Sequence, residues 1–478
     1  MKKICSFLLS ITILFSVFPL TVGAEGFPYQ FENGKPYSES ILMLNADTNT
    51  VVYSLEADKP RPIASLTKIM TYVVAYENIP DIENTVITIP ESISKELDGT
   101  YSSLADIEVG EELTGLQLLN LMMVPSGNDA ALALATYVDS LKIMPSSLQE
   151  ATAENSEKPN ASESTQKQAE TPLTFVDLMN RKAEELGCTN THFMNPHGLH
   201  DPEHYSTARD MMKIVQYARS LPNFTKITGQ TYYQLSPTNK RQDPNPVYST
   251  NRLLLQNQDP DYYYPYATGI KTGSLNESGY CLASSAVRDG YTYLIVALGS
   301  PYIDAEGNQI HNRGEMLDSR ELYQWAFSKL DLKTVAESGQ LMADIKLNYA
   351  WKKNRVQLVS AEDISVILPK EVEISSLITT LDIPESIDAP IKKGDVVGKA
   401  TLSYADEVVA TVPLVTAESV ERSEVVLTVE QGKAIFTSTW FKILAGLILV
   451  LIGIYIVITI VHNKSRKQRK SVRRYRDM

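Results

Sequence analysis

The sequence predicts an α+β fold for the large N-terminal part of the chain, followed by a small all-β domain and one transmembrane helix. Strand-rich hairpin patterns occur at 41–56 and again at 279–298, and mainly helical patterns lie between them. Beyond about residue 333 the chain changes to short alternating segments separated by turns. An uncharged apolar run from Ile443 to Val461 follows, and it is long enough to cross a bilayer.

Length and charge restrict the class of protein. A chain of 478 residues is expected to form two or three domains. The net charge is −13, and nothing in this acidic balance argues for a nucleic acid partner. Basic residues gather instead in the tail 462–478, where eight Lys and Arg accompany a single Asp. The rest of the chain is therefore more acidic than its net charge suggests.

Residues 1–24 are predicted to be a signal peptide. Lys2 and Lys3 precede a mostly apolar run, and the small residues Gly23 and Ala24 suit cleavage before Glu25. An uncleaved anchor is the alternative. A catalytic domain is then expected over 25–332.

The expected elements of this domain follow from periodicity and from turn residues. In chain order they are a hairpin at 41–56, a helix from about 65 to 76, a strand at 86–89, helices at 116–123, 129–138, 173–186 and 207–219, the hairpin at 279–298, and a helix at 315–330. The segment 145–172 is low in complexity and almost lacks large apolar residues, so it is expected to be a disordered insertion.

A first candidate site is Ser65 with Lys68, at the start of the helix expected after the first hairpin. Positions i and i+3 share a helix face, so the Lys68 amine can reach the Ser65 hydroxyl. A serine becomes a nucleophile when a nearby base takes its proton, and a lysine with a lowered pKa can be that base. The pattern alone is weak, because Ser92–Lys95 and Ser164–Lys167 match it too, and a solvated helix face is the alternative.

Two further short motifs follow. Ser126 and Asn128 are expected in a tight loop between two helices, because Pro125 and Gly127 interrupt the helical pattern there. This spacing is also weak alone, since 249–251 and 274–276 match it. Lys271-Thr272-Gly273 is expected on or just before a strand that pairs with the hairpin at 279–298.

Cysteines and histidines give no metal or disulfide signal. Cys188 and Cys281 are expected to be buried and free rather than bridged. A metal site is the alternative reading of His197, His200 and His204, but no cysteine or acidic pair completes a ligand set. Structural or hydrogen-bonding roles are therefore expected for these histidines, and neither a metal nor a cofactor is expected.

The C-terminal third is expected to comprise a small β-sandwich-like domain at 333–430, a transmembrane helix at 443–461 and a basic tail at 462–478. A buried core helix is the alternative for the apolar run. The basic tail predicts a cytoplasmic C-terminus, because Lys and Arg residues next to a membrane-spanning helix are enriched on the cytoplasmic side. With a secretory signal, both domains would then lie outside the cell membrane, which the chain crosses once.

Taken together, the three motifs resemble those of the penicillin-recognising serine acyl-enzymes, in the same order. Segments at 179–187, 193–199, 204–210 and 279–283 look like the low-molecular-mass D-alanyl-D-alanine carboxypeptidases. The resemblance covers roughly 35–430, apart from the insertion. It implies a penicillin-binding, β-lactamase-like catalytic domain, an antiparallel sheet with helices on both faces, with the β domain and the membrane anchor typical of that family.

The resemblance also implies roles for the motif residues. Ser65 would attack the carbonyl between two D-alanines of a peptidoglycan stem peptide, with Lys68 as its base. Ser126 would relay a proton to the leaving D-alanine. Asn128 would hold Lys68 and the substrate amide.

The family's third motif, here Lys271, Thr272 and Gly273, binds the substrate. Lys271 and Thr272 would bind the terminal carboxylate. The backbone N–H of Ser274 would complete an oxyanion hole with that of Ser65. β-Lactams would acylate Ser65 and leave slowly.

Two features of this chain depart from the family pattern, and two other functions remain as alternatives. Leu275 stands where the family often has Thr, which could alter carboxylate binding, and the insertion after the second motif is unusual. A class A β-lactamase is one alternative, but its Glu-x-x-Leu-Asn loop does not occur between 129 and 270. A catalytically silent β-lactam or cell-wall sensor is the other, but the tail is too short for a signalling domain.

Overall fold

A computed structural model describes residues 27, 29–100, 102–145, 171–404 and 407–474. The chain divides into two compact units, one reaching Leu332 and including Ile367–Glu371, the other starting at Lys333. The predicted signal peptide 1–24 and nearly all of the predicted insertion 145–172 lie outside the described residues. Those two expectations therefore stay predictions.

The first unit is built on a five-stranded sheet in which every neighbouring pair is antiparallel. Four of its strands come from the two hairpin regions that the sequence predicts, and the fifth, β7, is the strand expected to carry the third motif. The two ends of the domain therefore pair in the middle of the sheet. In spatial order the strands are β2 (Thr50–Leu55), β1 (Ser40–Asn45), β9 (Tyr291–Ser300), β8 (Gly279–Arg288) and β7 (Ala267–Leu275).

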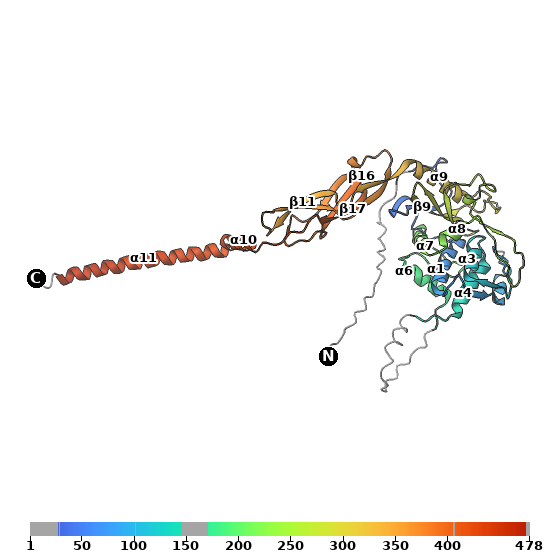
Figure 1. Ribbon diagram of the computed structural model, residues 1–478, viewed down its shortest axis with the longest axis horizontal. Helices are drawn as coiled ribbons and strands as arrows, with labels where there is room; N and C mark the ends of the chain where they lie inside the picture. Colours follow the sequence, from blue (N-terminus) through green and yellow to red (C-terminus); the bar gives the residue numbers. More distant parts are fainter. Residues whose placement is uncertain (1–26, 28, 101, 146–170, 405–406, 475–478) are drawn as a thin grey trace, which may run out of the picture. The chain divides into compact units, whose positions relative to one another are not determined.

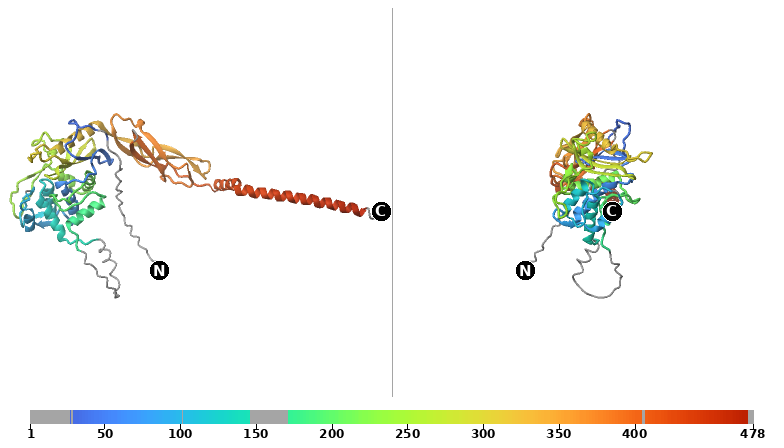
Figure 2. Two further views of the ribbon diagram at one scale, coloured as in Figure 1. Left: turned by 180° about the vertical axis from the view of Figure 1, so that it is seen from behind. Right: turned by 90° about the vertical axis from the view of Figure 1, so that its right-hand side faces the viewer.

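Both faces of this sheet are covered by helices, as the α+β prediction requires (Figure 1 and Figure 2). Side chains alternate between the two faces of a strand. Leu42 and Leu44 of β1 accordingly join the core beneath the larger group of helices, whereas Ile41 and Met43 join the core beneath α9 (Gly314–Lys329). A strand buried on both faces explains why β1 reads as a continuous apolar run.

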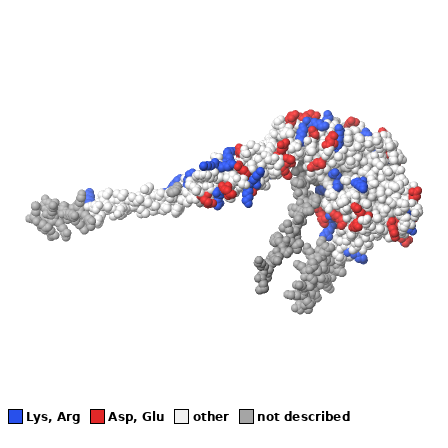
Figure 3. Space-filling model, viewed as in Figure 1, with Lys and Arg blue, Asp and Glu red and all other residues white. Residues whose placement is uncertain are grey.

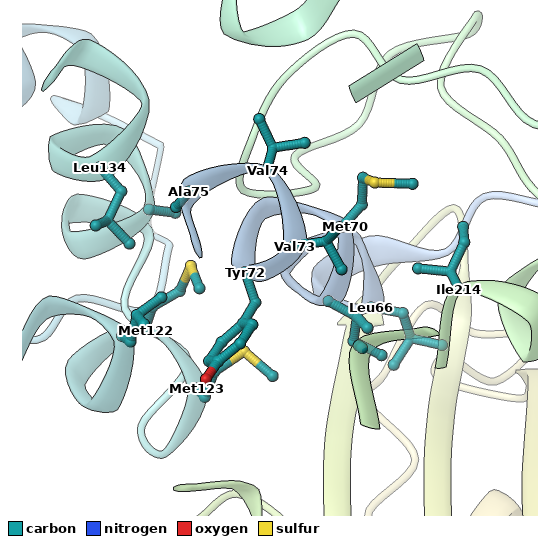
Figure 4. Packing of buried hydrophobic residues seen from close by; sticks show 14 of the residues in the cluster. Leu66, Met70, Tyr72, Val73, Val74, Ala75, Met122, Met123, Leu134 and Ile214 are labelled. Atoms are coloured by element: carbon teal, nitrogen blue, oxygen red, sulfur yellow. The ribbon is translucent and has the colours of Figure 1, made fainter. Parts of the chain in front are cut away.

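The larger helical layer surrounds α1, in which every residue from Thr67 to Ala75 is buried. Figure 4 shows Tyr72, Met122 and Leu134 packed in this core. Each such large apolar side chain contributes roughly 1.5–3 kcal/mol on burial. The helices of this layer are α1 (Thr67–Asn78), α2 (Glu91–Leu97), α3 (Gly115–Met123), α4 (Asn128–Ser140), α6 (Phe175–Glu185), α7 (Ala208–Ser220) and α8 (Phe224–Thr228).

Threonine side chains start three of these helices. Thr114 and Thr174 form full capping boxes with the residues three positions later, and the Thr207 hydroxyl accepts the Asp210 N–H. The remaining short elements are β3 (Val86–Thr88) paired with β4 (Glu112–Thr114), β5 (Tyr232–Tyr233) paired with β6 (Val247–Tyr248), and the 3₁₀ turns η1 (Ala64–Leu66) and η2 (Arg252–Leu254).

The second unit contains a six-stranded sheet in the order β14, β16, β17, β12, β11, β15. The expected all-β character of this region is confirmed, although residues 424–437, partly within the range expected for it, form a helix. Its elements are β11 (Leu341–Asn348), β12 (Arg355–Ser360), η3 (Ile374–Ser376), β14 (Ile378–Asp382), β15 (Ser386–Asp388), β16 (Val396–Tyr404), β17 (Glu407–Thr416) and α10 (Glu424–Thr437). A separate pair joins β10 (Leu330–Ala336) to β13 (Ile364–Pro369).

The last helix, α11, runs from Thr439 to Arg474. Over the described residues it is the one helix long and apolar enough to cross a membrane, across Thr439–Lys464. Between Lys442 and Lys464 the sequence has no Asp, Glu, Lys or Arg, and Figure 3 shows this uncharged surface as a white stretch. The helix thus matches the apolar run from which a membrane span is predicted.

Candidate active site

Ser65 lies in the 3₁₀ turn η1, which leads directly into α1. The α-helix itself begins two residues later than predicted, at Thr67, yet the serine still precedes Lys68 by one turn. Ala64 holds a left-handed conformation with φ of 47°, which is unfavourable for a residue with a side chain. Gly198 abuts the Ala64 carbonyl, where a Cβ atom would clash. The serine is therefore presented by a constrained turn.

Lys68 is fully buried and makes three hydrogen bonds. Its Nζ donates to Ser65 Oγ at 2.9 Å, to Asn128 Oδ1 at 2.6 Å and to the His197 carbonyl at 2.8 Å. A charged lysine has three donors, so these acceptors satisfy it completely. When the amine is neutral, two N–H groups can keep Asn128 and His197 while the lone pair faces the Ser65 hydroxyl. This is the geometry that a general base requires.

The electrostatic surroundings favour that neutral form. Burial lowers the pKa of the Lys68 amine well below its usual value, and the charge of Lys271 lowers it further, against a smaller opposing effect of Asp129. Taking a cation out of water without a carboxylate partner disfavours the charged state. Lys68 can therefore be a free base at a lower pH than an exposed lysine.

The second motif is placed beside this lysine by the start of α4. Asn128 is the first residue of that helix rather than a loop residue, which corrects the sequence-based expectation. Ser126 does lie in the turn before it, nearly buried and with a φ of 69°. Among the described residues its hydroxyl has no hydrogen-bond partner, so it remains available to a substrate.

The third motif lies on β7, as expected from its spacing. Lys271 is almost wholly buried, and burial together with the nearby charge of Arg313 lowers its pKa to about 7. Its Nζ donates to the Thr272 carbonyl at 3.0 Å. Lys271 also acts on Lys68 through its charge, so the two amines share one site.

Gly273 allows β7 to pass directly against the Ser65 turn. A Cβ atom at this position would lie 2.9 Å from the Ile63 carbonyl oxygen and 3.1 Å from the Ser65 nitrogen. Its φ is not left-handed, so the glycine is needed for space and not for conformation. The close approach brings the strand that carries Ser274 next to the Ser65 backbone, where two N–H groups can serve one oxyanion.

Comparison with known proteins decides the family. A family model described as D-alanyl-D-alanine carboxypeptidase matches residues 31–142 and 147–301, more than half of the chain. The chain belongs to this family. The function expected from the motifs, a serine-type D-Ala-D-Ala carboxypeptidase, is thereby confirmed. A second model, described as Penicillin-binding protein 5, C-terminal domain, matches residues 331–422.

Individual similar proteins agree with this family assignment. D-alanyl-D-alanine carboxypeptidase DacF of Bacillus subtilis is 28% identical over 431 residues, covering 88% of this chain and 96% of that protein. A D-alanyl-D-alanine carboxypeptidase of Streptomyces sp. K15 is 31% identical over 279 residues, 57% of this chain and 84% of that protein. The structure of penicillin binding protein 5 from Haemophilus influenzae superposes with a TM-score of 0.60 at 25% identity, covering 81% of this chain and 98% of that one.

Three residues of this candidate site were not expected from the sequence to contribute to it. The His197 carbonyl holds Lys68, Thr250 contacts Thr272, and Arg313 acts on Lys271. His197 lies in a segment that supports the resemblance, but its backbone role leaves no signal. Thr250 lies inside one of the Ser-x-Asn matches that spacing cannot separate from chance.

The histidines and cysteines have packing and hydrogen-bonding roles. His204 Nε2 lies 2.8 Å from Thr67 Oγ1, and the His197 ring accepts the Leu199 N–H. The described part of the chain contains no group of three side chains arranged to hold a metal. Cys188 and Cys281 are buried and free, as expected.

Proposed function

We propose that Ser65 is the nucleophile of this D-Ala-D-Ala carboxypeptidase and that Lys68 is its general base. The supporting observation is the buried Lys68 amine, which lies within hydrogen-bonding distance of both Ser65 and Asn128. A serine activated by a base of lowered pKa can form an acyl-enzyme at neutral pH.

In the proposed acylation, Ser65 Oγ attacks the carbonyl carbon between the two terminal D-alanines while Lys68 takes the hydroxyl proton. The negative charge on the carbonyl oxygen is stabilised by the backbone N–H groups of Ser65 and Ser274. Ser126 passes the proton to the leaving nitrogen. The C–N bond then breaks, D-alanine departs, and the stem peptide remains as an ester on Ser65.

Substrate orientation is assigned to the third motif. The Lys271 cation and the Thr272 hydroxyl bind the terminal carboxylate, since a charged pair strengthens hydrogen bonding to an anion. Arg313 adds positive charge beside Lys271. Asn128, which holds Lys68 through its Oδ1 atom, also contacts the substrate amide. Water then hydrolyses the ester and restores the Ser65 hydroxyl.

β-Lactams are expected to enter the same cycle. Their strained amide acylates Ser65, but the leaving nitrogen stays tethered to the acyl group and does not diffuse away. Slow hydrolysis then makes them covalent inhibitors, in keeping with the name penicillin-binding protein that a similar protein carries.

The site of action follows from the two ends of the chain. The apolar helix α11 is consistent with a membrane anchor. We assign the basic tail to the cytoplasm, because positive flanks stay inside, and both folded units to the outer side of a bacterial membrane. There the enzyme would trim pentapeptide stems and so limit their cross-linking.

A D-alanine release assay tests the assignment. The full chain in detergent is incubated with diacetyl-Lys-D-Ala-D-Ala beside the Ser65→Ala variant, and free D-alanine is measured. Release that vanishes in the variant supports the reaction and the nucleophile together. Release that persists in the variant, or no release with no labelling by a fluorescent penicillin, would remove Ser65 from the mechanism.

A further inference from the structure

Thr250 connects the second and third motifs of the site. Its hydroxyl lies 2.5 Å from the Thr272 hydroxyl, and its backbone N–H donates to the Val124 carbonyl, just before the turn that carries Ser126. No other residue of the described chain makes a side-chain hydrogen bond to Thr272 Oγ1. Among the described residues, Thr250 is thus the one whose side chain hydrogen-bonds to the hydroxyl that is assigned to the substrate carboxylate.

The backbone around Thr250 is held in place on both sides. The Ser249 N–H donates to the Thr231 carbonyl, and the Asn251 side chain caps η2 by accepting the Leu253 N–H at 3.1 Å. Thr250 itself is half-buried. A hydroxyl on such a fixed support has little freedom to lose when a partner binds.

The chemistry of a hydroxyl pair determines what this contact can do. Each hydroxyl has one proton and two acceptor lone pairs. If Thr272 donated to Thr250, it would have no proton for the substrate. If Thr250 donates to Thr272, the Thr272 proton is free to point at a carboxylate oxygen, and the chain of two hydrogen bonds is polarised toward the anion.

We propose that Thr250 is a positioning residue that directs the Thr272 proton toward the free terminal carboxylate of the substrate. It thereby contributes to the preference for substrates that end in a carboxylate. The inference rests on the proposed function, because it takes Thr272 as a carboxylate ligand. It assigns no contact between Thr250 and the reacting atoms.

The test compares two peptides that differ only at the C-terminus, diacetyl-Lys-D-Ala-D-Ala and its C-terminal carboxamide. We measure kcat/KM for both with the full chain and with Thr250→Val, which replaces the hydroxyl by a methyl group of similar size. The ratio of the two values is expected to fall about tenfold in the variant, because hydrogen bonds to charged groups are the strong ones. Most of the change should be an increase in KM for the acid.

Two further variants separate positioning from general damage. Thr250→Ser keeps the hydroxyl and should retain the wild-type ratio. In a Thr272→Val background, adding Thr250→Val should change the ratio no further, because two residues that act through one group are not additive. Acylation by a fluorescent penicillin to full stoichiometry confirms that each variant is folded.

The possible results of this test distinguish the role of Thr250 from the carboxypeptidase assignment. An unchanged ratio in Thr250→Val, an equal loss on acid and amide, or an additive double variant overturns the role of Thr250 while leaving the carboxypeptidase assignment intact. A wild-type protein that releases no D-alanine from the acid overturns both. If Thr250→Val does not fold, an altered ratio in Thr250→Ser still counts against the proposal.

Discussion

Gly273→Ala should impair catalysis by crowding the turn that carries the proposed nucleophile, Ser65, rather than by removing a side chain from the proposed site. The added Cβ atom would lie 2.9 Å from the Ile63 carbonyl oxygen, whereas ordinary contacts begin at 3.4 Å. Either β7 or the Ser65 turn must therefore move by about 0.5 Å. Since a misplacement of about 1 Å can cost about 10²-fold in rate, we expect kcat/KM to fall by about 10- to 10²-fold.

The assay measures penicillin acylation and D-alanine release by Gly273→Ala, together with its thermal unfolding. Overpacking typically costs about 1–3 kcal/mol of stability, so the protein should remain folded and the substrate KM should change less than kcat. Gly432→Ala is the matched control, because a Cβ there meets nothing within 4 Å. Activity of Gly273→Ala within twofold of wild type would refute the close approach of β7 to Ser65.

Two other substitutions and one pH dependence test the charges of the first unit. Asn128→Asp should raise the pKa of Lys68, move the acid limb of the acylation profile to higher pH, and lower kcat/KM at neutral pH by about 10²-fold. Because the pKa of Lys271 is about 7, its protonated fraction falls about tenfold between about pH 6 and 8, and KM for a carboxylate substrate should rise by about that factor. Arg241→Ala leaves the buried Glu111 carboxylate without its ion-pair partner, and urea unfolding should show a loss of about 3 kcal/mol.

Each of these has a control. An acid limb that does not move in Asn128→Asp would show that Lys68 is not the titrating base. Lys271→Arg should abolish the rise in KM, because an arginine keeps its charge; a rise that persists would assign it to another group. Lys95→Ala removes an exposed ion pair and should lower the free energy of unfolding by less than about 1 kcal/mol. If Arg241→Ala lowered it by no more than Lys95→Ala does, the buried ion pair with Glu111 would not have the expected effect on stability.

The pH dependence of stability provides a check that needs no substrate. In the unfolded chain Lys271 keeps its ordinary pKa, and in the folded protein it loses its proton near pH 7. Between these values the unfolded state binds more protons, so the free energy of unfolding should increase as the pH rises above about 7. The Lys271→Met variant should show a smaller increase, because the lowered pKa of Lys68 contributes to it with the same sign.

Most elements of the fold were predictable from local patterns. Alternation and turns located β1, β2, β8 and β9, and helical periodicity located α6 and α7, whereas the capping role of Thr174 was found only in the structure. Boundaries were less certain, as Asn128 shows: Pro and Gly before it indicate a break, but only packing determines that α4 starts at this residue. The helix α10 was not expected, because its sequence has no strong periodicity.

The sequence by itself determined the chemical class of this protein. Ser65 and Lys68 are three residues apart, so local helical geometry alone brings their side chains together, and the three motifs in order indicate the reaction. Tertiary structure decided how that chemistry is controlled. The lowered pKa of Lys68, the space that Gly273 leaves for Ser65, and the contact of Thr250 with Thr272 all depend on segments far apart in the chain. Burial and contact between distant segments are properties of the packed core, which no local pattern contains.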